Sequence, residues 1–163
     1  MDRLTLALLT FDVGVPAASP DAFADRVCAQ VREAWDDGAD LVVLPEFLWM
    51  GLEPFVARED KLRGVARLFW TDLWPRLAPR LAQVDKGVVL GTVPFLGPDG
   101  LLRNRAPIWD GRAFRHQDKL HLTPWEAAFV GGAFAGKAQG DLAADAAAAA
   151  GHEQGASSPL GHR

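Results

Sequence analysis

The stretch LVVLPE, residues 41–46, decides the fold. Its four apolar residues run without alternation, which indicates a strand that is covered on both faces. Pro45 lacks the backbone N–H that a sheet ladder needs, so regular pairing is expected to stop there. Glu46 then lies at the carboxyl end of the strand, where open α/β sheets bind their ligands. On this stretch alone, Glu46 is either a site residue or an acidic residue that opens a loop.

The segment before this stretch predicts a strand and a helix. Residues 4–11 are short and apolar and indicate a first buried strand. Apolar residues then recur at helical spacing from Asp21, which we expect to cap the helix, to the stop signal at residues 36–38. The connection is long enough for a right-handed crossover, so the sequence predicts two parallel strands joined by a helix.

The segment after Glu46 predicts a second helix and a third strand. Residues 59–83 carry a helical pattern that Pro75 and Pro79 interrupt, so we expect a kink there or a second short helix. Residues 87–93 are apolar and β-branched and indicate a strand, in which Gly91 marks a position of close backbone approach.

We expect the strand at residues 87–93 to end at Pro94 and a hairpin to follow it. Residues 106–109 and 113–119 flank the turn sequence Asp110-Gly111 and have the pattern of two antiparallel strands. The second strand of this predicted hairpin delivers Lys119.

The composition is that of an ordinary globular domain and excludes several classes of function. The chain has 163 residues, of which 49% are hydrophobic and 23% charged. A net charge of -4 and a pI near 5.5 give no support for binding to nucleic acids or to membranes. We therefore expect a small soluble substrate or a protein partner. A single cysteine excludes an intrachain disulfide framework and favours a cytoplasmic location.

Residues 133–163 differ from the rest of the chain because alanine and glycine dominate them. They offer almost no large apolar side chains to bury, so we expect this tail to be disordered or weakly helical. Residues 1–132 are then the folded domain.

Four motifs together resemble the nitrilase, or carbon–nitrogen hydrolase, superfamily. They are LVVLPE at 41–46, GTVP at 91–94, NRAPIWDG at 104–111 and KLHLTPWE at 119–126. Each motif is weak by itself, but their order and spacing give a strong signal over residues 4–132. The resemblance implies the N-terminal part of an α-β-β-α sandwich, in a family that commonly dimerises.

The resemblance also implies roles for three residues. Glu46 matches the general base of the family, Lys119 its lysine and Glu126 a second glutamate near that lysine. In the chemistry of the family a cysteine attacks an amide or nitrile carbon, a carboxylate takes its proton, and an ammonium stabilises the developing charge. No cofactor and no metal is expected, and the expected substrate is a small amide or nitrile.

Three aromatic residues lie beside these positions in the sequence. They either line a substrate pocket or pack in the core: Phe47, Trp49 and Trp125.

The nucleophilic cysteine of the family has no counterpart after the lysine motif. The only cysteine, Cys28, lies in the predicted first helix, where we expect a buried and inert thiol. We therefore interpret the chain as a truncated or inactive carbon–nitrogen hydrolase, in which the tail is an out-of-frame continuation or follows a truncation. The alternative is a non-catalytic fragment that acts as a subunit in a homo- or hetero-oligomer.

Overall fold

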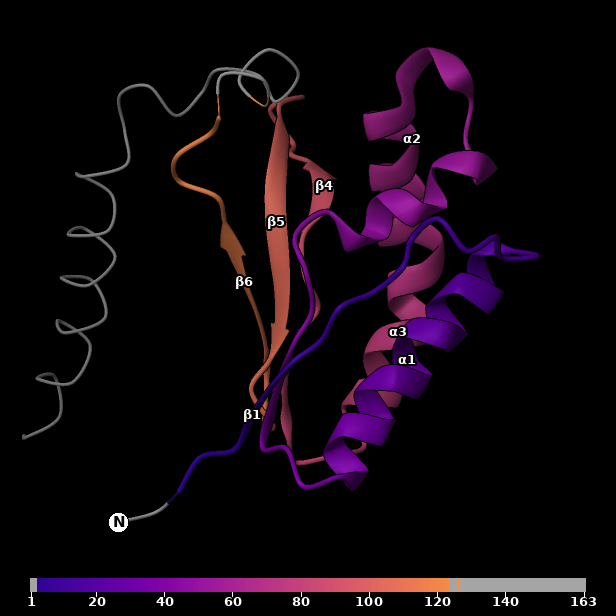
Figure 1. Cartoon of the computed structure of the whole chain (residues 1–163). Coiled ribbons are helices and arrows are strands. Elements are labelled where there is room, and N and C mark those ends of the chain that lie inside the picture. The colour runs from indigo at the N-terminus through magenta and orange to yellow at the C-terminus, as the bar shows by residue number, and fades with distance from the viewer. Residues whose placement is uncertain (1–2, 124–125, 127–163) are drawn as a thin grey trace, which may run out of the picture. The chain divides into compact units, whose positions relative to one another are not determined.

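The computed structural model describes residues 3–123 and residue 126, all within one compact unit, Met1–Gly131. A six-stranded sheet runs through these residues, and α-helices cover one of its faces (Figure 1). The strands are β1 (Leu6–Leu8), β2 (Leu41–Val43), β3 (Gly87–Val89), β4 (Val93–Leu96), β5 (Leu102–Trp109) and β6 (Phe114–Asp118). The α-helices are α1 (Pro20–Asp36), α2 (Lys61–Arg67) and α3 (Trp74–Leu81), and two 3-10 helices lie between β2 and α2, at Leu48–Phe55 and Arg58–Asp60. The predicted α/β class is confirmed.

The strands β1, β2 and β3 are parallel neighbours, and α1 connects β1 to β2 as predicted. The sheet order is β1-β2-β3-β5-β4, with β6 paired to β5. The cap of α1 is Ser19, so the prediction of Asp21 is wrong. The Ser19 Oγ accepts a hydrogen bond from the Ala22 backbone N–H at 3.1 Å. Pro20 follows in the first turn, where its missing N–H costs nothing.

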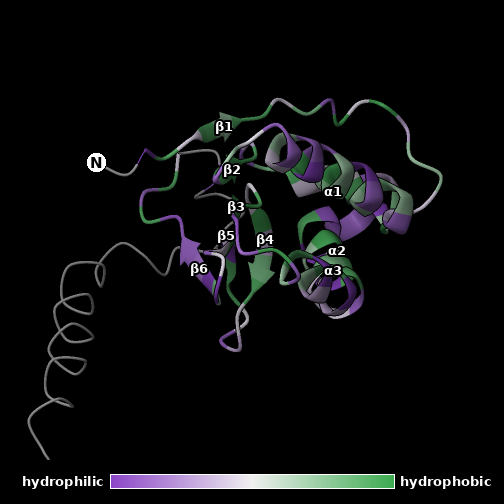
Figure 2. Ribbon diagram, turned by 90° about the horizontal axis from the view of Figure 1, so that it is seen from below, coloured by the Kyte–Doolittle hydropathy of each residue, from purple (hydrophilic) through white to green (hydrophobic). Residues whose placement is uncertain are grey.

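The core lies between the sheet and the helices, which Figure 2 shows gathered on one side of the strands. Val42 and Val88, opposite each other on β2 and β3, are fully buried. Val27 and Val31 of α1 are also fully buried in this core. Burial of each such side chain contributes about 1.5–3 kcal/mol. This packing fixes β2 and therefore the position at which the chain leaves it toward Glu46.

The second helical segment changes its geometry before Pro75. Between α2 and α3, residues Leu68–Leu73 form a π-helical turn, and α3 then starts at Trp74. A proline inside a helix has no N–H to donate, and its ring collides with the carbonyl four residues earlier, so the wider turn accommodates it. The predicted restart at this proline is confirmed, but the sequence did not indicate the π-helical form.

The segment after β3 contains a one-residue bulge. β3 and β4 lie end to end along the same side of β5, and both pair with it in antiparallel fashion. Three residues lie between Val89 and Val93, whereas two lie between their partners Ile108 and Arg105. The prediction that one strand ends at Pro94 is wrong, because Pro94 lies inside β4. A proline fits there because β4 is an edge strand that pairs only with β5.

Gly91 is the residue that makes this bulge possible. Its φ of 66° lies in the left-handed region, which favours glycine. A side-chain carbon at this position would overlap with the backbone oxygen of Pro45. The predicted close backbone approach at Gly91 is confirmed, and it holds the bulge against the residue that precedes Glu46.

The predicted tail, residues 133–163, lies outside the described residues, so its boundary and its state stay predictions. Within residues 3–123, no helix combines the length and the apolar character that a membrane span requires.

We expect Gly91→Ala to destabilise the protein more than Gly100→Ala does. Both glycines have positive φ, but a side-chain carbon at Gly100 would meet nothing within 4 Å. The shared backbone penalty is about 1–2 kcal/mol, and steric overlap at Gly91 adds about 1–3 kcal/mol to the loss in unfolding free energy. Urea denaturation of the two variants measures the difference. Equal losses would show that Gly91 does not pack against Pro45.

Candidate active site

The structure brings together the three polar residues that the resemblance singled out. Glu46 follows β2, Lys119 follows β6 directly, and Glu126 lies seven residues further on. The Lys119 Nζ lies 2.8 Å from the Glu46 Oε1 and 2.9 Å from the Glu126 Oε2. The predicted convergence of Glu46 and Lys119 is confirmed, although they are 73 residues apart in the sequence.

The charges of this cluster support one another. The hydrogen bonds that Lys119 donates to Glu46, and then to Glu126, raise the pKa of its ammonium group above the ordinary value. Glu126 is buried, with 2% of its surface exposed, and burial alone raises its pKa. Donors from Thr123, Lys119 and Asn104 outweigh burial and lower the pKa of Glu126 to about 2. Lys119 and Glu126 are therefore both charged at neutral pH.

Thr123 and Glu126 bind each other reciprocally. The Thr123 backbone N–H donates to the Glu126 Oε2 at 2.8 Å, and the Glu126 backbone N–H donates to the Thr123 Oγ1 at 3.2 Å. This is the capping-box arrangement, and its spacing of three residues is visible in the sequence TPWE. Sequence reasoning missed it, although the signal was present.

Asn104 is the site residue whose contacts the sequence did not indicate. It lies within β5, and only 1% of it is exposed. Its Nδ2 donates to the Glu46 Oε1 at 2.8 Å and to the Glu126 Oε1 at 3.1 Å. A polar residue inside a strand that also buries Leu102 and Trp109 was the available signal.

Cross-strand contacts between β5 and β6 fix the start of the Lys119 segment. The Lys119 backbone N–H donates to the Asn104 carbonyl oxygen at 2.8 Å. Arg105 binds the neighbouring Asp118 through two hydrogen bonds of 2.6 Å and 2.9 Å, and its guanidinium lies 3.6 Å from the centre of the Phe95 ring. Bidentate pairs of this kind hold a defined geometry.

Contacts with the Gly91 bulge fix the backbone around Glu46. Phe47 has a φ of 55°, which is strained for a residue other than glycine. Its backbone N–H donates to the Thr92 Oγ1 at 2.8 Å, next to Gly91. Strain of this kind persists only where neighbouring contacts over-determine the conformation.

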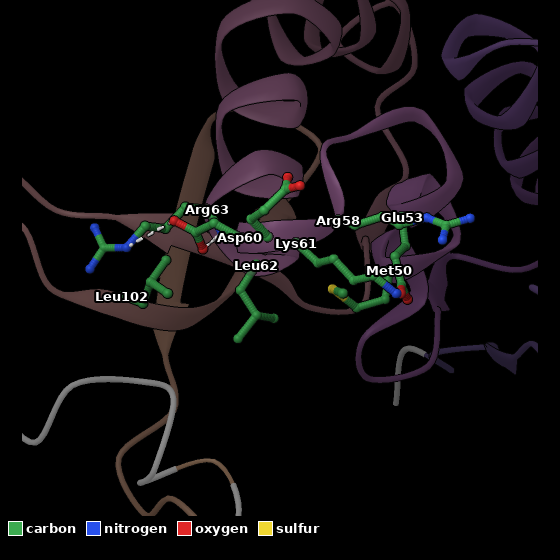
Figure 3. Close-up of a pocket in the computed structure, with 9 residues that line it drawn as sticks. Met50, Glu53, Arg58, Asp60, Lys61, Leu62, Arg63 and Leu102 are labelled. Atoms are coloured by element: carbon green, nitrogen blue, oxygen red, sulfur yellow. Dashed lines mark hydrogen bonds and ion pairs between the residues drawn. The ribbon is translucent and has the colours of Figure 1, made fainter.

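A cavity of about 430 Å³ is lined by residues between positions 50 and 63 and by Leu102 of β5, and Figure 3 shows the side chains around it. The four residues of the charged cluster are not part of this lining. Met50, Leu62 and Leu102 provide its apolar lining. Leu102 lies two residues before Asn104 on β5. Leu122, next to Thr123, packs against the same small apolar cluster as Leu62 and Leu102.

The charged lining of the cavity is largely paired. Lys61 forms an ion pair with Glu53, and Arg63 contacts Asp60 at 3.5 Å. Among residues 3–123 and 126, no group of three His, Cys, Asp or Glu side chains has an arrangement that suits a metal ion.

Comparisons with known proteins bear on the fold. No protein-family model and no curated protein matches the sequence. The chain is similar to an amidase from Nesterenkonia sp., with 17% identity, a TM-score of 0.48, and coverage of 78% of this chain and 46% of that one. It is also similar to a cysteine-to-alanine mutant of the Nesterenkonia AN1 amidase from the nitrilase superfamily, with 19% identity, a TM-score of 0.46, and coverage of 78% and 47%.

A third solved structure is a glutamine-dependent NAD+ synthetase from Acinetobacter baumannii. Its TM-score is 0.50 at 18% identity, over 80% of this chain and 24% of the synthetase. The chain has a nitrilase-like fold. It spans less than half the length of each of these three proteins.

Within this nitrilase-like fold, the three aromatic residues beside the site have different positions. Trp49 is fully buried between Phe23 and Phe69, and its Nε1 donates to the Leu90 carbonyl oxygen at 2.8 Å. Trp49 is therefore a core residue and does not line a pocket. Phe47 is half-buried beside Glu46, and Trp125 lies outside the described residues.

The single cysteine of the chain does not have the properties of a nucleophile. Cys28 is buried in the core on α1, as predicted. Burial raises the pKa of its thiol, so the reactive thiolate is scarce at neutral pH.

The low pKa of Glu126 predicts a pH-dependent stability. The unfolded chain has the ordinary value of 4.5 and the folded chain about 2. Ionised Glu126 therefore stabilises the fold fully above the unfolded pKa, and this contribution is lost as the pH falls through the folded pKa. We expect the free energy of unfolding to decrease between about pH 5 and pH 2, and Glu126→Gln to flatten this decrease.

Denaturation series at several pH values measure this effect. Glu33→Gln, at an exposed position of α1, is the matched control and is expected to keep the wild-type slope. A slope that Glu126→Gln leaves unchanged would contradict the charged state assigned to Glu126.

Proposed function

We propose that this chain supplies the base and the cation of a carbon–nitrogen hydrolase site that acts on a small amide or nitrile. The contact of Lys119 with both Glu46 and Glu126 carries the proposal. Glu46 is the proposed general base, and Lys119 stabilises the charge that develops on the oxygen or nitrogen of the substrate. Glu126 keeps Lys119 charged and in place, in a supporting role.

The proposed reaction needs a thiol that this chain does not offer. The sulfur forms a bond to the substrate carbon, Glu46 takes the thiol proton, and for an amide that proton passes to the departing amine. Water then cleaves the thioester: Glu46 takes a proton from the water, the oxygen bonds to the carbon, and the proton passes to the departing sulfur, which restores the thiol. Because Cys28 is buried, we propose that the nucleophile comes from outside this chain. A cytoplasmic setting suits this chemistry, since a reducing compartment keeps thiols free.

We propose the cavity that Leu102 lines, two residues before Asn104 on β5, as the position of the substrate's organic group. Its apolar lining by Met50, Leu62 and Leu102 suits an uncharged aliphatic or aromatic chain. Half-buried Phe47, directly after Glu46, is a further candidate for the lining of this pocket.

We expect the chain alone to show no hydrolysis in a panel of amides and nitriles. We also expect iodoacetamide to modify Cys28 slowly in the native protein and rapidly in urea, because burial and a raised pKa both protect the thiol. Product detection and mass spectrometry measure the two effects. Hydrolysis that disappears in Cys28→Ser would overturn the proposal of an external nucleophile.

A second candidate function, that of a non-catalytic subunit, is favoured by the sheet face opposite the helices. Ala7 of β1 packs toward the core, so its neighbours Leu6 and Leu8 point to the other face. These leucines are 51% and 73% exposed. Exposed apolar surface of this kind marks interaction sites. The proposed partner is a second copy or a subunit that brings the thiol.

We expect Leu8→Lys to weaken any assembly that forms through this face, because the ammonium group would have to be desolvated in the interface. Val15→Lys, at an exposed loop position, is the matched control. Sedimentation velocity measures the mass of the assembly. A wild-type chain that stays monomeric at high concentration, and that captures no thiol-containing subunit, would argue against this function.

A further inference from the structure

We infer that Asn104 is a positioning residue, which fixes Glu46 so that its Oε2 and not its Oε1 receives the proton of the attacking group. This inference rests on the proposed function, because it assigns one atom to the proposed base role of Glu46. Three features carry it: the unequal contacts of the two carboxylate oxygens, the rigidity of Asn104, and the division of its two N–H donors.

The two oxygens of Glu46 have different surroundings. Oε1 accepts hydrogen bonds from the Asn104 Nδ2 and from the Lys119 Nζ, each at 2.8 Å. Within residues 3–123 and 126, no donor contacts Oε2. The Glu46 side chain is 48% exposed, so this oxygen remains accessible. An oxygen that already accepts two hydrogen bonds has no lone pair left in the carboxylate plane, whereas Oε2 keeps both of its own.

Asn104, and not Lys119, is the rigid one of these two donors. Asn104 lies inside β5, paired with Pro94 on one side, and its carbonyl binds the Lys119 N–H on the other. Its side chain is short and almost fully buried. Lys119 reaches the same oxygen at the end of a flexible four-carbon stem. The strand-borne amide therefore sets the geometry, and the ammonium supplies the charge.

The amide group of Asn104 also keeps the two carboxylates apart in function. One N–H binds the Glu46 Oε1, and the other binds the Glu126 Oε1 at 3.1 Å. The Asn104 Oδ1 is buried and has no hydrogen-bond partner among residues 3–123 and 126. An unpaired buried carbonyl costs about 1–3 kcal/mol. A residue that carries this cost is present for its donors and not for stability.

Nuclear magnetic resonance of the ¹³C-labelled chain tests the inference without any turnover. In the wild type we expect three-bond couplings along the Glu46 side chain that fit one rotamer. In Asn104→Leu, which keeps the volume and removes the donors, these couplings are expected to average toward those of a free glutamate. The pKa of Glu126 is expected to rise from about 2, because a donor to its charged form is lost.

Gln117→Leu is the matched control. Its amide lies on neighbouring β6 but donates only to the Asp118 carbonyl oxygen, so both readouts are expected to stay at wild-type values. If Asn104→Leu does not fold, Asn104→Ser serves, because one hydroxyl donates a single hydrogen bond and cannot bind both carboxylates. A folded Asn104 variant in which Glu46 keeps a single rotamer would overturn the inference.

Different results would contradict the proposed function and this inference. If Glu46 loses its fixed rotamer in Asn104→Leu, positioning by Asn104 is supported. If, in addition, no thiol-bearing partner ever restores hydrolysis to the wild-type chain, the base role of Glu46 is overturned.

Discussion

One ammonium group between two carboxylates is the interaction on which the site depends. Two carboxylates that contact the same ammonium group lie close enough to repel each other. One of them, Glu126, is buried, where a charge is costly. The Lys119 ammonium group contacts both, and the two N–H donors of Asn104 contact the same pair. Removal of Lys119 takes away the positive charge that both carboxylates share, and removal of Asn104 takes one hydrogen-bond donor from each of them.

The scaffold delivers these groups from parts of the chain that are far apart in sequence. The end of β2 is pressed against the Gly91 bulge, which sets the backbone before Glu46. The β5–β6 hairpin carries Asn104 within one strand and Lys119 just beyond the other. Arg105 and Asp118 form the neighbouring pair across these two strands. The site is therefore a property of the sheet as a whole, and no single loop contains it.

The sequence predicted those parts of the fold that depend on local pattern. Apolar patterns located α1, β2 and the hairpin, and the resemblance located the three charged residues of the site. A strand was also found within residues 4–11, but the prediction that it is buried is wrong, because Leu6 and Leu8 of β1 are exposed. The sequence did not distinguish Ser19 from Asp21 as the cap of α1, because serine and aspartate are equally good capping residues. The bulge was missed because it is defined by pairing with β5, which no local pattern reveals. The contacts of Asn104 were missed for the same reason, since only the folded sheet shows its two carboxylate partners.

The long sequence separations within the site have a consequence for how the chain folds. The contact between Glu46 and Lys119 closes a loop over a sequence separation of 73 residues, and the contact between Glu46 and Asn104 closes one over 58 residues. Loops of this length lose much configurational entropy before any contact compensates for it, so such pairs form after the local helices and the hairpin. The charged cluster thus assembles late on the folding pathway, and protection of its amides from hydrogen exchange reports that the sheet is complete.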